Sequence, residues 1–170
     1  MLDGLAGRPK LAVLDTMNYW IASAKPQLLE VLRRVDVLVL NDGEARELAG
    51  TPNLVRAAQV IRGLGPPSVV IKKGEHGALL FDGGGVFVAP AYPLENVFDP
   101  TGAGDTFAGG FVGSLAASGA RDAAALRRAV VHGSALASFT VEKFGPERLR
   151  SVTREELDER TKAFRALTEF

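Results

Sequence analysis

Short apolar runs alternate with segments of helical periodicity through the first half of the chain. Buried strands are predicted where consecutive side chains are almost all apolar, at residues 11–14, 37–40 and 68–71. Helices are predicted between these runs, from Lys25-Pro26 onward, at residues 44–49 and at residues 53–63. An alternation of strands and helices is typical of a parallel sheet whose strands are joined by crossover helices.

The second half of the chain has a different pattern, with a hairpin followed by long helices. Residues 77–89 hold two apolar runs around Asp82-Gly83-Gly84-Gly85, which predicts a hairpin at the edge of the sheet. Helices are predicted after the proline- and glycine-containing segment that follows, at residues 103–118, 121–142 and 153–167. The pattern therefore predicts an α/β fold with a mainly parallel sheet flanked by helices. Three parallel strands are few for a doubly wound sheet, so we expect the later part of a larger domain.

Composition narrows the classes of protein to which the chain can belong. It has 170 residues, of which 46% are hydrophobic, enough for a sizeable core. The 20 basic and 20 acidic side chains balance, which argues against binding to nucleic acid or to a membrane surface. The absence of cysteine excludes disulfides, thiolate zinc sites and cysteine nucleophiles. No apolar run approaches about 18 residues and no signal peptide is recognised, so a cytoplasmic protein is expected.

The strongest candidate for chemistry is the segment Asp-Pro-Thr-Gly-Ala-Gly-Asp-Thr-Phe-Ala-Gly-Gly at residues 99–110. Gly102, Ala103 and Gly104 stand where irregular chain is predicted to turn into a helix, so their N–H groups can approach an anion closely. Asp105 follows in the first helical turn. A carboxylate beside an anion site is suited to take a proton from a nucleophile that attacks a bound phosphate.

Two other interpretations of this segment are open on local grounds. A purely structural helix start, with Asp105 as a stabilising first-turn acid and the glycines for close packing, has the same residues. A dinucleotide-binding fingerprint requires a strand directly before it and an acidic residue about 20 positions later. Pro100 precedes the glycines and Asp122 falls in a turn, which disfavours that fingerprint. A Walker A loop is excluded because the segment has no Gly-Lys-Ser/Thr.

The segment resembles the C-terminal signature of the ribokinase-like (PfkB) family of carbohydrate and nucleoside kinases. Other stretches match the family in the same order: Asn41-Asp42-Gly43-Glu44 after a strand, Lys72-Lys73-Gly74-Glu75-His76-Gly77 after the next, and His132-Gly133-Ser134-Ala135 on a later helix. The resemblance implies a three-layer ribokinase-like fold and ATP-dependent phosphoryl transfer to a hydroxyl group of a sugar or nucleoside.

The resemblance also implies roles for particular residues. Asp105 is the general base, and the backbone of residues 102–104 is the anion hole. Glu44 acts through water on Mg²⁺, and Asn41 supports the phosphates. The same two residues are also typical of a helix cap and a first-turn acid.

The remaining roles concern the nucleotide and a second cation. Lys72, Gly74 and Gly77 belong to a turn that contacts the nucleotide, although Lys72 also fits a solvated strand end. His132 lies beside the adenine or is a packed helix histidine. Asp99 and Thr101, with carbonyl groups of residues 139–145, hold a monovalent cation such as K⁺.

The match covers the C-terminal part of such kinases, and we expect residues 1–170 to be their ATP-binding and catalytic-base half. The N-terminal strands, the small β lid and the glycine-pair motif that holds much of the sugar are missing from this sequence. The expected partner is a small sugar or nucleoside, with homodimerisation in the full-length protein. A nucleotide-binding remnant without catalysis is the alternative.

Overall fold

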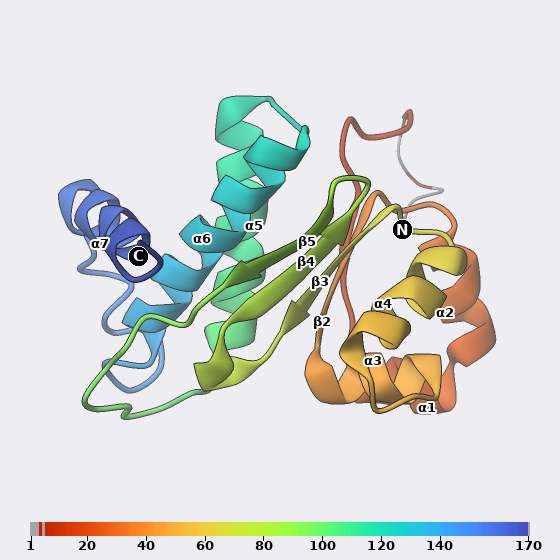
Figure 1. The fold of residues 1–170 in the computed structure, drawn as a ribbon, viewed down its shortest axis with the longest axis horizontal. Coiled ribbons are helices and arrows are strands. Elements are labelled where there is room, and N and C mark those ends of the chain that lie inside the picture. The colour runs from red at the N-terminus through yellow and green to blue at the C-terminus, as the bar shows by residue number, and fades with distance from the viewer. Residues whose placement is uncertain (1–3, 5, 170) are drawn as a thin grey trace. The chain divides into compact units, whose positions relative to one another are not determined.

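The computed structural model describes residues 4 and 6–169, and the chain divides into two units at the junction of Val69 and Val70. The first unit alternates short strands with helices (Figure 1). Its elements are β1 (Val13–Asp15), α1 (Asn18–Ser23), α2 (Lys25–Leu32), β2 (Val37–Asn41), α3 (Asp42–Ala49) and α4 (Leu54–Gly63).

Strand β2 forms the centre of the first unit. Residues 37–40 are at most 2% exposed, as expected for a run of four apolar side chains covered on both faces. The strand pairs in parallel with β1, with Val13 opposite Val37. A parallel pair requires a crossover, which α1 and α2 provide. Helix α3 then ends at Gly50, whose φ of 67° is a left-handed conformation that glycine adopts without strain.

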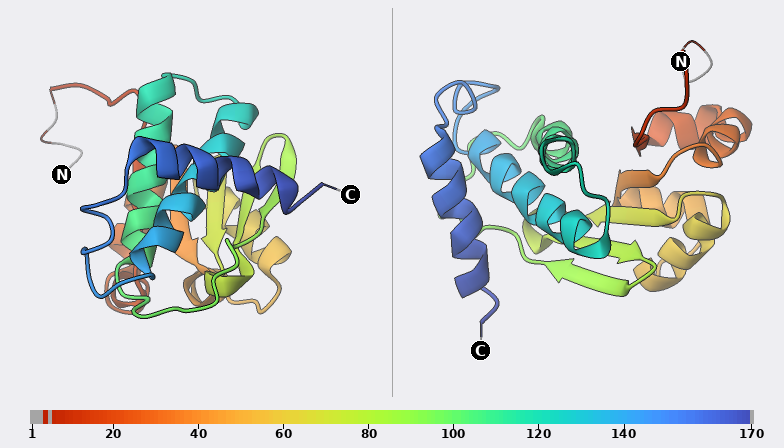
Figure 2. Two further views of the ribbon diagram at one scale, coloured as in Figure 1. Left: turned by 90° about the vertical axis from the view of Figure 1, so that its left-hand side faces the viewer. Right: turned by 90° about the horizontal axis from the view of Figure 1, so that it is seen from above.

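The second unit consists of a hairpin followed by three longer helices. Strand β3 (Ser68–Lys72) crosses the junction, and the later elements are η2 (Gly74–His76), β4 (Ala78–Asp82), β5 (Gly85–Ala89), α5 (Ala103–Ser118), α6 (Ala123–Thr140) and α7 (Arg154–Ala166). Strands β4 and β5 are antiparallel, with Ala78 opposite Ala89. Figure 2 shows α6 lying beside both α5 and α7.

The observed elements agree with the predicted ones to within two residues at their ends. The strand order is β1-β2-β3-β4-β5, so the three predicted strands are neighbours and the hairpin lies at the edge. The parallel pairing of the first two strands is confirmed. Helix α1 was not predicted. Its side chains Tyr19 and Trp20 are 58% and 49% exposed, and Ile21 alone is buried, so it has no amphipathic stripe.

Helices α5 and α6 approach closely at two glycines. A Cβ on Gly133 would lie 2.7 Å from the carbonyl oxygen of Phe107, and one on Gly110 would lie 2.8 Å from Leu136 Cδ1. A methyl group at Gly133 would meet backbone, which cannot rotate away as a flexible side chain can. Both glycines therefore have a packing role that their place in the family signature does not reveal.

We expect Gly133→Ala to lower the free energy of unfolding by about 1–3 kcal/mol, because the added methyl group overpacks the α5–α6 contact. The matched control is Gly113→Ala on α5, where an added Cβ meets nothing within 4 Å. At such a site alanine is expected to stabilise the helix by about 0.5–1 kcal/mol. Urea denaturation followed by circular dichroism measures both, and equal effects would contradict the packing argument.

None of the helices in the part of the chain that the structure describes combines the length and the hydropathy needed to cross a lipid bilayer.

Candidate active site

The glycine-rich segment forms the start of α5, as predicted. Gly102 is the N-cap, with φ 80° and ψ −2°, a left-handed conformation suited to glycine. Glycine has no side chain with which to cap the helix. Side chains cap four other helices through Asn41, Asn53, Asp122 and Thr153. The N-terminus of α5 therefore keeps backbone donors that a side-chain cap would otherwise occupy.

The backbone donors of this turn are not equivalent. The N–H of Ala103 donates to the carbonyl oxygen of Pro100 at 3.2 Å, and that of Thr106 donates to Gly102 at 2.9 Å. One of the three N–H groups predicted to face an anion is thus already hydrogen-bonded. Helix geometry leaves the N–H groups of Gly102, Gly104 and Asp105 as the donors at this helix start that are available to a ligand.

Asp105 and Lys72 lie at this helix start. Asp105 is exposed, and among the described residues no hydrogen bond or ion pair holds its carboxylate. Lys72 ends β3, and a Cβ built on Gly104 would lie 3.2 Å from its Nζ. The structure therefore brings an ammonium group, a glycine backbone and a carboxylate together within the second unit. Such a group of charges can bind an anion and accept a proton beside it.

The turn after β3 is a closed loop of backbone hydrogen bonds. The N–H of Lys73 donates to the carbonyl oxygen of Gly77 at 2.8 Å, and the N–H of Gly77 donates to Gly74 at 3.1 Å. Gly77 has φ 83°, and a Cβ there would lie 2.1 Å from the carbonyl oxygen of Ala89. The backbone at the end of β5 passes so close to residue 77 that there is no room for a side chain, which explains the glycine at this position. Gly74 has φ 56°, and a Cβ at that position would meet nothing within 4 Å.

Asp99 joins the segment before α5 to the segment after α6. Its Oδ1 accepts a hydrogen bond from the N–H of Thr101 at 3.0 Å, and its Oδ2 accepts one from the N–H of Gly145 at 3.4 Å. Hydrogen bonds from Thr101, and a weaker one from Gly145, lower the pKa of Asp99 below its ordinary value. The N–H of Phe98 also donates to the carbonyl oxygen of Val141 at 2.8 Å. The predicted neighbourhood of Asp99 and residues 139–145 is thus observed.

Asn41 and Glu44 lie in the first unit, where they form a capping box. Glu44 N–H donates to Asn41 Oδ1 at 2.8 Å, and Asn41 N–H donates to Glu44 Oε2 at 2.9 Å. Glu44 is only 5% exposed. Among the described residues, no three acidic or histidine side chains gather closely enough to hold a metal ion by themselves. Magnesium usually keeps several waters and needs only one or two carboxylates, so Glu44 has suitable chemistry.

The sequence profile of the pfkB family of carbohydrate kinases matches residues 8–151. The chain belongs to this family. Among curated relatives, the cytidine kinase of Thermococcus kodakarensis is 41% identical over 87 residues, which are 50% of this chain and 31% of that protein. The ribokinase of Haemophilus influenzae is 29% identical over 153 residues, which are 86% of this chain and 48% of that protein.

Solved structures agree with this assignment to the pfkB family. The aminoimidazole riboside kinase of Salmonella enterica, in complex with aminoimidazole riboside and an ATP analog, superposes with a TM-score of 0.74 at 26% identity. The match covers 87% of this chain and 51% of that one. The predicted ribokinase-like fold is confirmed. The chain spans about half the length of this kinase, and half or less of the two curated relatives.

His132, which the pfkB resemblance assigns to the adenine, lies half-buried on α6. Burial lowers its pKa below the ordinary value of 6.5, and the positive charge of Arg154 lowers it further, while Asp158 has the opposite effect. The imidazole ring is therefore neutral at neutral pH. The charges that face it come from α7.

This pKa shift predicts how stability depends on pH. The unfolded chain binds the proton of His132 more tightly than the folded chain, so the free energy of unfolding falls as pH decreases through about 6.5. His132→Asn should flatten that decrease, and His76→Asn, at an exposed turn residue, is the control. Urea denaturation between pH 5 and 8 measures the effect, and an unchanged slope in His132→Asn would contradict it.

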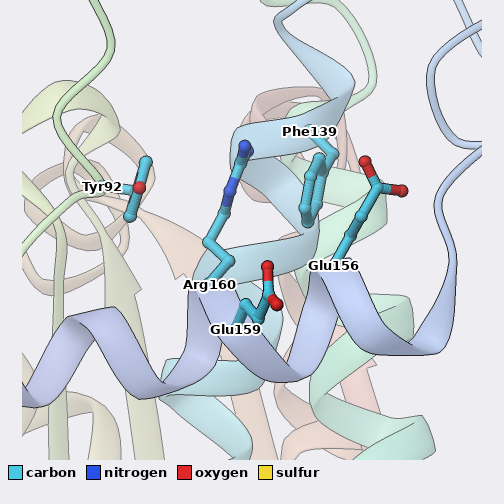
Figure 3. Close-up of a pocket in the computed structure, with 5 residues that line it drawn as sticks. All are labelled: Tyr92, Phe139, Glu156, Glu159 and Arg160. Atoms are coloured by element: carbon cyan, nitrogen blue, oxygen red, sulfur yellow. The ribbon is translucent and has the colours of Figure 1, made fainter.

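A cavity of about 240 Å³ lies elsewhere in the second unit, beside α7. Its walls are Tyr92, Phe139, Glu156, Glu159 and Arg160 (Figure 3). Of the predicted site residues, all of which the structure describes, only Phe139 of the segment 139–145 lines it. The sequence gives no signal for this cluster, because its members come from separate segments and have no spacing typical of a site.

Proposed function

We propose that this chain is the C-terminal, nucleotide-binding and catalytic-base part of a kinase that transfers a phosphoryl group from ATP to a hydroxyl group of a sugar or nucleoside. The arrangement at the start of α5 supports this most directly. There an uncapped helix N-terminus, the Lys72 ammonium group and the exposed Asp105 carboxylate lie together. The substrates after which its relatives are named, which include cytidine and aminoimidazole riboside, agree with a small hydroxyl acceptor.

The proposed steps follow from the charges at the helix start. The N–H groups of Gly104 and Asp105, with the Lys72 ammonium group, stabilise the negative charge on the transferred phosphoryl oxygens. Asp105 accepts the proton of the attacking hydroxyl group as the oxygen–phosphorus bond forms. The nucleoside diphosphate leaves as its bond to the same phosphorus breaks. Positioning and charge neutralisation thus account for most of the catalysis.

Glu44 and Asn41 are the residues we assign to Mg²⁺ and to the nucleotide phosphates. The ion supplies charge neutralisation on the phosphate oxygens when it is bound. The capping box uses Oδ1 of Asn41 and Oε2 of Glu44 and holds both side chains at the start of α3. Gly74, Gly77 and His132 are assigned to the nucleotide.

A monovalent cation is assigned to Asp99, Thr101 and the carbonyl groups of residues 139–145. The lowered pKa of Asp99 supports this, because an ionised carboxylate is a better cation ligand than a protonated one. A cytoplasmic location and a homodimeric full-length protein complete the proposal.

A nucleotide-binding protein without catalysis is the second candidate. The two candidates differ in one experiment. Co-expression with the N-terminal half of a related kinase should produce sugar or nucleoside phosphorylation if the catalytic machinery works. Nucleotide binding without turnover in the completed protein would favour the non-catalytic candidate.

Isothermal titration calorimetry of the 170-residue chain with Mg²⁺ and ATP or ADP tests nucleotide binding itself. We expect weak binding, because the helix start and Lys72 are present without the remaining half of the fold. The isolated chain should show little or no phosphorylation of a sugar or nucleoside. Absence of binding at millimolar nucleotide would count against the proposed site, and robust turnover would show that the acceptor half is not needed.

A further inference from the structure

Two arginines contact the ring of Phe139 near the end of α6. The guanidinium carbon of Arg160 lies 3.5 Å from the ring centroid, and that of Arg148 lies 4.9 Å from it. Phe139 is 1% exposed, so the ring is buried. Figure 3 shows Arg160 extending from α7 between the rings of Tyr92 and Phe139. The two rings beside Arg160 restrict the plane of its guanidinium group.

Both arginines bind the same carboxylate. Arg160 Nη1 lies 2.5 Å from Glu142 Oε1, and Arg148 Nε lies 3.0 Å from Glu142 Oε2. The side chains of Arg148, Arg160 and Glu142 are only 15–23% exposed. Arg148 also binds Glu156 Oε1 at 2.6 Å, which ties the cluster to the first turn of α7. Each oxygen of Glu142 therefore has a charged donor, which restricts its side chain to one orientation.

Glu142 lies between the two contacts that join its loop to the start of α5. Directly before it, the carbonyl oxygen of Val141 accepts from Phe98 N–H at 2.8 Å. Three residues after it, Gly145 N–H donates to Asp99 Oδ2 at 3.4 Å. Asp99 in turn accepts from Thr101 N–H, next to the N-cap Gly102. A continuous set of contacts thus runs from α7 through Glu142 to the turn that begins α5.

We infer that Arg148 and Arg160 act through Glu142 as positioning residues, which hold the loop of residues 141–145 against Asp99 and so fix the turn that precedes Asp105. This inference rests on the proposed function of that turn. Neither arginine is among the residues that we assign to the nucleotide or to the acceptor. Their effect reaches the site through backbone hydrogen bonds of Phe98 and Gly145.

Hydrogen–deuterium exchange of the full chain, with Glu142→Gln, tests the inference. Glutamine keeps the size of the side chain but removes the charge that both arginines bind. We expect the Phe98 and Gly145 amides to exchange at least about tenfold faster, while the amides of β4 and β5 are unchanged. Affinity for Mg²⁺ and ADP, measured by calorimetry, should fall. The matched control is Glu159→Gln, which changes an exposed residue of the same cavity.

Arg160→Lys is the second variant. It keeps a positive charge for Glu142 but loses the planar guanidinium group and its stacking on Tyr92 and Phe139. It should have a smaller effect at the same two amides, and it keeps the test usable if Glu142→Gln does not fold. Unchanged exchange at Phe98 and Gly145, or faster exchange throughout the second unit, would overturn the inference. Faster local exchange with unchanged nucleotide affinity would also overturn it. If the wild-type chain binds no nucleotide, the proposed function fails separately, and the exchange measurements alone decide whether the arginines hold the loop.

Discussion

Asp105→Asn is expected to lower kcat by at least about 10²-fold in a kinase completed with the N-terminal half of a relative, with ATP affinity almost unchanged. Asparagine keeps the size of the side chain but cannot accept the proton of the attacking hydroxyl group. The interaction is made only in the transition state, so the loss appears in kcat and not in nucleotide binding. Steady-state kinetics with calorimetry separate the two.

Glu155→Gln is the matched control for Asp105→Asn. Glu155 is also an exposed acid in the first turn of a helix, here α7. If Asp105 only stabilised the helix dipole, the two variants would both change stability slightly and leave turnover intact. Near-normal turnover in Asp105→Asn would remove the assignment of a general base.

Gly104→Val is expected to weaken binding of Mg²⁺ and ATP by at least about tenfold, which corresponds to about 1.4 kcal/mol. A Cβ at this position already lies 3.2 Å from Lys72 Nζ, so a branched side chain displaces the ammonium group. The same side chain also occupies the space through which a phosphate reaches the helix N-terminus. Calorimetry on the folded variant measures the loss.

Gly109→Val on the same helix separates this effect from the difference in helix propensity between glycine and valine. A Cβ at Gly109 meets nothing within 4 Å, and the position is exposed. Glycine has the lower helix propensity of the two residues, so the effect of propensity has the same sign in both variants. Equal nucleotide affinity in the two would show that Gly104 has no special relation to a phosphate.

Local patterns predicted most of the elements because they depend on neighbours in the chain. The apolar run at residues 37–40 predicts a buried strand wherever it lies, and the turn chemistry of residues 82–85 favours a hairpin. The Thr153–Glu156 capping box at the start of the predicted helix 153–167 is likewise local, since its residues are three positions apart. Helix α1 was missed because its exposed Tyr19 and Trp20 give no helical stripe.

Some features of the candidate site likewise follow from local sequence, and others only from the tertiary structure. The glycines at residues 102–104 and the acid at Asp105 were predicted from sequence, because the start of a helix is a local feature. The catalytic and ligand roles of these residues remain predictions. From the sequence, Lys72 fitted either a solvated strand end or a place near the phosphates, and the structure puts its ammonium group beside Gly104. The two residues are far apart in the chain, and only folding brings them together.

By itself, the sequence determined the family, the order of strands and helices apart from α1 and the short η2, and the glycines at the start of α5. The tertiary structure alone decided that Gly133 is needed for helix packing, that Asp99 meets Gly145, and that Arg148 and Arg160 share Glu142. The physical reason is the range of the interactions. Periodicity, caps and turns act over a few residues, whereas close packing and ion pairs between distant segments depend on where the whole chain places their backbones.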